Sequence, residues 1–347
     1  MSNSTAFWQP DLFSGKSTIE GAKKSREVNI GDFVLSNSMS YGRPYIVNIH
    51  GYIHDGWLLL SNFDNRLIKE YLYYILSSDT VQKQFNNLAT GITVDNLNVE
   101  RVSSVKIPLP PLDVQEQIVR ECEAMDEEVA QAQQAIEQAE QEIEKAIIDI
   151  AQKGYPNKKT EDFAEINPSK TEIRQIDDET MVSFVEMASV SDEGYIAKKE
   201  DKPLKEVRAS SYTYFREDDI IIAKITPSME NGKCAIAEGL TNNLGMGSSE
   251  FHVIRADKAI ALPEYVFAFL NRESVRQEAA TKMTGASGHR RVPASFYEQF
   301  VIPLPQDIKV QEDLITKIKN QKTAITQSKQ IIEGSAERKQ AILKKYL

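Results

Sequence analysis

The second half of this sequence repeats the first at an offset of about 195 residues, and this repeat restricts the possible folds more than any other feature. The segment Ile107–Pro110 reads I-P-L-P and leads through Val114–Glu116 into a long helical pattern. The segment Ile302–Pro305 reads I-P-L-P again and leads through Val310–Glu312 into a second helical pattern. Such a chain is expected to contain two related structural units, each followed by a long helix.

The repeat also extends upstream of both proline-rich segments. Three further pairs of segments keep the same order and nearly the same offset, which makes chance similarity among apolar patterns a poor explanation. The pairs are Glu70–Leu76 with Glu264–Leu270, Thr90-Gly91 with Thr284-Gly285, and Gly31–Leu35 with Asp218–Ile222. The first pair is typical of short amphipathic helices, and the last of apolar strands after an acidic turn.

Each repeat is predicted to begin with a mixed α/β globular part. Short β-rich runs lie at Tyr45–Ile49, Met181–Glu186 and Phe251–Arg255, and Gly, Asn and Pro residues separate them. Prolines at 108, 110 and 111, and at 303 and 305, favour extended backbone. Each globular part therefore ends in an extended arm.

The first long helical pattern is predicted to form a coiled-coil seam. Its apolar residues alternate at spacings of four and three, which is the 3.5-residue period of supercoiled helices. They are Ile118, Cys122, Met125, Val129, Ala132, Ile136, Ala139, Ile143, Ala146 and Ile150.

The second pattern has a poorer seam but a complementary charge. Its seam residues are Leu314, Ile318, Ile325 and Ile332, with Ile342 beyond them. Residues 112–153 carry a net charge of −9 and residues 306–347 a net charge of +4. We expect an antiparallel pair with one globular part at each end. The alternative is two helices that dock separately on their own globular parts.

The predicted fold is therefore α+β, with two mixed α/β domains and an antiparallel two-helix coiled coil. The domain ranges are 1–110, shortened at its N-terminus, and 155–304. The helix ranges are 111–154 and 305–347.

Bulk composition limits the class of protein without identifying it. The net charge of −10 argues against nucleic-acid binding at first, but nearly all of the excess lies on residues 112–153. No apolar run approaches the roughly 18 residues of a membrane helix, and Met1–Pro10 does not read as a signal peptide. Two unpaired cysteines, Cys122 and Cys234, suit a reducing cytoplasm.

Several fragments imitate catalytic motifs but lack a required partner. Gly15–Ser17 lacks the first glycine of a phosphate loop, and Asn167–Lys170 lacks the aromatic residue that stacks on a flipped base. His50 and His54 have no third zinc ligand, so a hairpin is expected there. Asp218-Asp219 lacks the further carboxylate of a metal-dependent nuclease. We therefore expect no catalytic residue and no metal site.

Taken together, these residues resemble the specificity subunits of Type I restriction–modification systems. The family pattern I-P-L-P-P-L-x-x-Q-x-x-I matches Ile107–Leu112 continuing to Gln115 and Ile118. The second copy is looser, because Gln306 replaces the second proline. Phe184–Val190 also resembles the opening strand of the family's recognition domains.

The resemblance implies a chain that reads a bipartite target in double-stranded DNA and has no catalysis of its own. It implies two methyltransferase subunits and a restriction and translocase subunit as partners. S-adenosylmethionine, ATP and Mg²⁺ would bind to those partners and not to this chain.

One departure from the family pattern concerns the first globular part. It offers about 106 residues before its I-P-L-P motif, against about 150 in the second. No segment near the N-terminus matches Phe184–Val190. Either the first recognition domain is reduced, or its opening strand is lost or supplied by another chain.

Candidate DNA contacts are polar and basic residues in loops that could enter a groove or meet phosphates. Two loops are candidates in each repeat, one after the first strand and one that begins at the Thr-Gly pair. In the first repeat they are Ser36, Asn37, Ser38, Tyr41, Arg43, Thr90, Thr93 and Asn96. In the second they are Lys224, Thr226, Ser228, Asn231, Lys233, Ser287, His289, Arg290 and Arg291.

Two other interpretations remain open from the sequence. One is a remnant subunit in which only one recognition domain works. The other is a coiled-coil scaffold that joins two protein-binding modules without nucleic acid, which the neutral-to-acidic globular parts allow.

Overall fold

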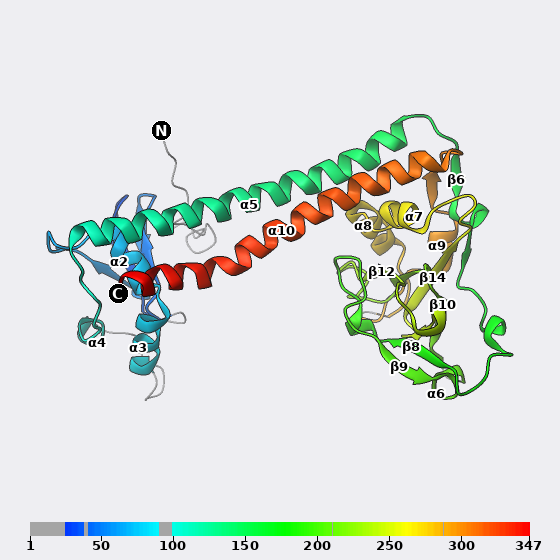
Figure 1. Ribbon diagram of the computed structural model, residues 1–347, viewed down its shortest axis with the longest axis horizontal. Coiled ribbons are helices and arrows are strands. Elements are labelled where there is room, and N and C mark those ends of the chain that lie inside the picture. Colours follow the sequence, from blue (N-terminus) through cyan, green and yellow to red (C-terminus); the bar gives the residue numbers. More distant parts are fainter. Residues whose placement is uncertain (1–24, 38–40, 90–98, 210, 287) are drawn as a thin grey trace. The chain divides into compact units, whose positions relative to one another are not determined.

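The computed structural model divides the chain into two compact units (Figure 1). Unit 1 comprises Met1–Gln138 with Ala324–Leu347, and unit 2 comprises Ala139–Thr323. The boundary between the units cuts both long helices, whereas the predicted domain ranges made each helix a segment of its own. The reason is that each helix end packs into a globular core. The described residues are 25–37, 41–89, 99–209, 211–286 and 288–347.

Both predicted long helices are present. Helix α5 spans Leu112–Gln152 and helix α10 spans Ile308–Tyr346. Helix α5 begins directly after the proline arm, where the carbonyl of Pro111 accepts hydrogen bonds from the amides of Val114 and Gln115.

Unit 1 is built around one strand that is buried on both faces. All four residues of β2 are buried. Phe33 and Leu35 face the core under α2, and Val34 faces the β1–β4 ribbon. A strand covered on both sides needs a continuous apolar run, which explains the sequence pattern. The described elements before α5 are β1 Arg26–Val28, β2 Phe33–Ser36, β3 Pro44–Ile46, β4 Gly51–Ile53, β5 Trp57–Leu60, α2 Lys69–Leu76, α3 Asp79–Ala89 and α4 Val99–Ser103.

Unit 2 repeats this plan around β11, whose four residues are also all buried. Strand β11 lies inside the sheet β12-β11-β14-β7, and a second sheet has the order β10-β13-β8-β9. The strands are β6 Asn157–Lys159, β7 Ala164–Ile166, β8 Met181–Val185, β9 Glu200–Pro203, β10 Thr213–Arg216, β11 Ile220–Ala223, β12 Cys234–Ile236, β13 Leu244–Gly247, β14 Phe251–Ala256 and β15 Val301–Pro303. The helices before α10 are α6 Leu204–Arg208, α7 Pro263–Leu270, α8 Glu273–Lys282 and α9 Ala294–Glu298.

The internal repeat predicted from the sequence is confirmed, because the two units share a connected set of elements. The sheet β3-β2-β5 corresponds to β12-β11-β14, and the pair β1-β4 corresponds to β10-β13. The turn before each central strand also matches. Gly31 and Asp218 both have positive φ, 87° and 67°. The carbonyl of the next residue, Asp32 or Asp219, accepts a hydrogen bond of 2.8 Å. The donor is the backbone amide of the residue directly after β3 or β12.

Unit 2 also contains strands that have no counterpart among the described residues of unit 1. Strand β8 pairs in parallel with β13, whereas β4 pairs only with β1 in the described part of unit 1. The strand predicted at Phe184–Val190 is partly wrong. The strand ends at Val185, and Met187–Ser189 forms a single 3₁₀ turn.

The repeated I-P-L-P and V-Q-E motifs form the same hydrogen-bonded latch in both units. In unit 1 the hydroxyl of Tyr71 donates to the Pro108 carbonyl at 2.7 Å. In unit 2 the hydroxyl of Tyr265 donates to the Pro303 carbonyl at 2.5 Å. The tyrosine of the short helix therefore holds the extended arm against the domain.

A buried glutamine completes the latch in unit 1. Gln115 is fully buried, and its Oε1 accepts the backbone amide of Ile68 at 2.9 Å. Its Nε2 donates to the carbonyls of Arg66 at 2.7 Å and Pro110 at 2.8 Å. The side chain thus connects the arm, the start of α5 and the start of α2.

Gln311 repeats this arrangement in unit 2. It accepts from the amide of Leu262 and donates to the carbonyls of Ile260 and Pro305, at 2.9, 3.0 and 3.2 Å. A buried amide group must satisfy all of its hydrogen bonds, which accounts for glutamine at this position.

The predicted seam residues are buried or half-buried along both helices. The buried ones are Ile118, Cys122, Met125, Ala132, Ala139, Ala146, Ile150, Leu314 and Ile318. Val129, Ile136, Ile143, Ile325 and Ile332 are half-buried. The sequence missed Leu343, which is 5% exposed and packs with Ile118 in the core of unit 1. The idea that each helix docks only on its own globular part is therefore wrong for unit 1.

Ion pairs within unit 1 give the direction of the two helices. As residue numbers rise along α5, the partners fall along α10, so the helices run antiparallel there. The pairs are Glu121 with Lys345, Asp126 with Lys339, and Glu128 with Arg338. Within unit 2, Lys317 lies 3.8 Å from Glu142. The charge complementarity predicted from the sequence is present in these pairs.

Candidate nucleic-acid interface

The two loops predicted as separate DNA contacts in the second repeat meet in unit 2. We call residues 224–233 the first loop and residues 284–292 the second loop. The amide of Thr226 in the first loop donates to the Arg290 carbonyl at 3.0 Å. The amide of Val292 in the second loop donates to the Lys224 carbonyl at 2.8 Å. The backbone therefore joins the two loops into one surface.

The arginines of the second loop are paired with carboxylates. Arg291 makes a two-pronged contact with Glu250, at 2.9 Å from Nε and 2.7 Å from Nη2. This hydrogen bonding lowers the pKa of the Glu250 carboxyl. Arg290 lies 3.4 Å from Glu230. A phosphate would have to displace or share these carboxylates before it could meet either guanidinium.

The lysines of the first loop are also partly buried or bonded within the protein. Lys224 is half-buried, and burial lowers the pKa of its ammonium group. The Lys233 ammonium donates to the Val190 carbonyl at 2.7 Å. Ser228 is half-buried, and its carbonyl accepts the amide of Lys233 at 3.1 Å. The charge that this surface offers is therefore smaller than its sequence indicates.

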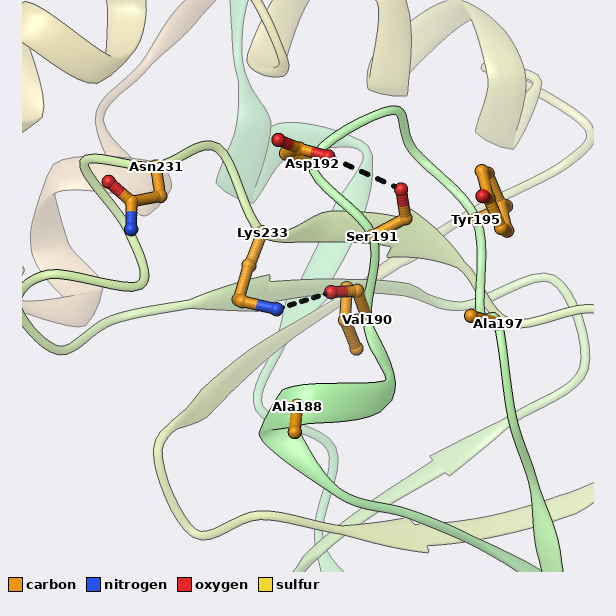
Figure 2. A pocket seen from close by; sticks show the side chains of 8 residues that line it. All are labelled: Ala188, Val190, Ser191, Asp192, Tyr195, Ala197, Asn231 and Lys233. Atoms are coloured by element: carbon orange, nitrogen blue, oxygen red, sulfur yellow. Dashed lines mark hydrogen bonds between the residues drawn. The ribbon is translucent and has the colours of Figure 1, made fainter. Parts of the chain in front are cut away.

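Asn231 and Lys233 also line a hollow of about 460 Å³ that sequence reasoning did not find (Figure 2). The opposite wall comes from residues 188–197, a segment bridged between Val190 and Ile196. Asp192 and Tyr195 lie on this wall, and Tyr195 is 52% exposed. No motif in the sequence marks this segment, because its position depends on the bridge and on the Lys233 contact.

The corresponding loop of unit 1 follows β2. Ser36 and Asn37 are buried, and the Asn37 amide group donates to the Asp55 carbonyl at 2.8 Å. These two residues therefore shape the loop and are not presented at the surface. Tyr41 is half-buried and Arg43 is exposed. Of the four, Arg43 is the residue best placed to meet a phosphate.

Arg43 and Lys233 occupy equivalent positions in the two units. The amide of Ser36 donates to the Arg43 carbonyl at 3.0 Å, and the amide of Ala223 donates to the Lys233 carbonyl at 2.9 Å. Each repeat thus places one cation at the point where its first loop rejoins the sheet.

The remaining predicted contacts fall into two groups. The His289 side chain is exposed, and the Thr226 hydroxyl is buried with no hydrogen-bond partner among the described residues. Ser38, Thr90, Thr93, Asn96 and Ser287 lie outside the described residues.

Gly15–Ser17 lies outside the described residues, and the other fragments that resembled catalytic motifs have structural roles. Asp219 is 3% exposed at its side chain and forms a two-pronged contact with Arg255 at 2.6 and 2.8 Å. His54 accepts the amide of Gly56 at 2.8 Å inside a turn. Asn167 has a positive φ of 56°, as a turn residue does. Within the described ranges, no three His, Cys, Asp or Glu residues are grouped to hold a metal ion.

Sequence reasoning also missed a buried histidine beneath the two loops. His252 lies on β14 and is 5% exposed. Its Nε2 lies 2.8 Å from the Val292 carbonyl, and its Nδ1 lies 3.1 Å from the Asn167 amide nitrogen. Burial lowers the pKa of His252, so the neutral ring is favoured.

Comparison with known proteins gives a match for the first part of the chain. Residues 2–141 match the family model of the Type I restriction modification DNA specificity domain. The Escherichia coli EcoAI Type I restriction enzyme specificity subunit is 38% identical over 156 residues, which is 45% of this chain. The matched stretch spans only 26% of that relative's length.

Two solved structures share the fold over most of the chain. One comes from work on complex assembly and conformational transition of the type I R-M system. The match covers 93% of this chain and 83% of that protein's chain, with 16% identity and a TM-score of 0.54. The Type I S subunit from M. genitalium covers 98% and 91%, with 12% identity and a TM-score of 0.53.

No helix in the described part of the chain is long and apolar enough to span a membrane. On these comparisons, residues 2–141 are similar to Type I restriction modification DNA specificity domains, and the chain shares its fold with these two solved structures.

Proposed function

We propose that this chain reads a two-part DNA sequence for a Type I restriction–modification complex and performs no chemistry itself. Each unit would read one half of the target, and the paired helices would set the spacing between the halves. The chain would dock two methyltransferase subunits and a restriction and translocase subunit in the cytoplasm. S-adenosylmethionine, ATP and Mg²⁺ would bind to those partners.

The observation that carries this proposal is the duplicated frame. Both units place a loop after a fully buried central strand, and a cation, Arg43 or Lys233, stands where that loop ends. Both units also fix the following long helix with the same tyrosine and glutamine bonds. Two copies of one binding frame on one chain are what a reader of two half-sites requires.

The test is to map methylated bases across the genome in cells with and without this gene. We expect adenine methylation at one bipartite motif to disappear with the gene and to return with the wild-type copy. A variant with Arg43→Glu should lose methylation as well, because a carboxylate there repels the phosphate backbone. An unchanged methylation map in cells without the gene would rule out the proposed function.

One observation favours a narrower alternative, in which only unit 2 reads sequence. The second sheet of unit 2 includes β8 and β9, and the described residues of unit 1 contain no equivalent strands. In that case the methylated motif would have one defined half and no fixed second half.

A further inference from the structure

His252 links four segments of unit 2 that are distant in the sequence. It lies on β14 between the turn at Asn167 and the end of the second loop at Val292. Val292 in turn donates its amide to the carbonyl of Lys224, the first residue of the first loop. One imidazole therefore stands at the junction of both candidate reading loops.

The surrounding bonds determine which ring nitrogen carries the proton. The Oδ1 of Asn167 accepts the backbone amide of Val253 at 3.1 Å, so its amide nitrogen faces His252 and donates to Nδ1. The proton of the neutral ring must then be on Nε2, where it donates to the Val292 carbonyl at 2.8 Å. With a neutral ring, both nitrogens of His252 have a hydrogen-bond partner.

Protonation of His252 would disturb this pattern. A proton on Nδ1 would meet the Asn167 amide nitrogen at 3.1 Å, which is itself a donor, and the Asn167 Oδ1 at 3.3 Å, which already accepts the amide of Val253. The charged groups nearby are Lys224, which opposes the imidazolium, and Glu250, which favours it but is already bound to Arg291. The ring of Tyr297 packs against His252 at 5.6 Å between centroids and offers no counter-charge.

We propose that neutral His252 is a positioning residue that fixes the two loops of unit 2 against each other for sequence reading. This inference rests on the proposed function, because it concerns how one half-site is read. His252 itself is buried and touches no DNA. Its effect would pass through the Val292 carbonyl to the second loop and through Val292 to Lys224 in the first.

The experiment selects binding sites for the full chain from a pool of random duplexes, for the wild type, His252→Phe and His252→Gln. We expect His252→Phe to reduce base discrimination in one half of the selected sequence by about tenfold or more, since misplaced contacts cost on the order of one good base contact. The other half should keep its preferences and serves as an internal control. His252→Gln keeps a donor for Val292 and should restore discrimination.

A pH series supplies a readout that a purely structural role does not move. In the wild type, discrimination in that half should fall as the pH drops below about 6.5, the ordinary histidine value. The midpoint should lie below that value because burial opposes the charged ring. In His252→Gln the same half should show no such midpoint. His50→Gln, which removes an exposed imidazole in unit 1, is the matched control and should behave as the wild type.

Each outcome bears on one of the two proposals. If the wild type selects no sequence at all, the proposed function fails and this inference fails with it. If the wild type selects a bipartite sequence but His252→Phe keeps both halves unchanged, or weakens both equally, only the positioning role is overturned. If His252→Phe does not fold, a wild-type pH series without a midpoint between about pH 6.5 and about pH 5 overturns it as well.

Discussion

The glutamine latch permits a prediction of stability that does not depend on DNA. Gln115 is fully buried at the point where the proline arm, α2 and α5 meet. Replacing it with leucine keeps a similar volume but removes every polar atom. The change should destabilise unit 1 without disturbing the helical pattern of α5, since leucine is a good helix former.

The magnitude follows from the three bonds that are lost. Gln115 accepts from the amide of Ile68 and donates to the carbonyls of Arg66 and Pro110. A typical hydrogen bond contributes about 1 kcal/mol net, and a buried group left unpaired costs about 1–3 kcal/mol. We therefore expect Gln115→Leu to lower the free energy of unfolding of unit 1 by about 3 kcal/mol.

Urea unfolding of the full chain measures this loss. Gln117→Leu is the control, because Gln117 is exposed two residues further along the same helix. Gln311→Leu should cause a similar loss in unit 2, where the same three bonds occur. If Gln115→Leu and Gln117→Leu differ by less than about 0.5 kcal/mol, the latch contributes no more than an ordinary surface residue and the reasoning is wrong.

The remaining predictions concern the seam, the second sheet and the spacing of half-sites. Val129→Asp with Ile136→Asp should cost several kcal/mol by placing carboxylates in the helix pair, and unchanged thermal unfolding would contradict that model. Gly245→Ala would place a Cβ 2.1 Å from a buried phenylalanine ring, so it should destabilise unit 2 by about 1–3 kcal/mol in urea; an unaltered transition midpoint would show that the ring moves freely. Deleting the heptads Ala132–Gln138 and Thr326–Ile332 together should shorten the spacer of the methylated motif and leave both halves intact. An unchanged spacer would mean that the paired helices do not set it.

The amino-acid sequence alone was sufficient to predict the repeat, the seam and the resemblance to Type I specificity subunits. These depend on patterns that local physics makes visible. A 3.5-residue period shows which helix face will be buried, and Ile118, Cys122 and Met125 are indeed buried. A continuous apolar run such as Phe33–Leu35 indicates a strand covered on both faces, as β2 is. The opposite charges of the two helices likewise predicted ion pairs such as Glu128 with Arg338.

The role of individual polar residues needed the tertiary structure. The sequence marks Gln115 only as one letter of a motif, and its role became clear once three backbone groups were found around its amide. Arg291 reads as a free cation in a glycine-rich loop, but Glu250, 41 residues away in sequence, binds it from the turn before β14.

The candidate interface shows the same limit most clearly. Two loops that lie about 60 residues apart in sequence were predicted separately, and backbone bonds from Thr226 and Val292 make them one surface. His252 gave no signal at all, because its environment consists of residues from three other segments. Periodicity reports which side of an element is buried, whereas the partners of a buried polar atom are set by how the sheets bring distant segments together, and only the tertiary structure decides that.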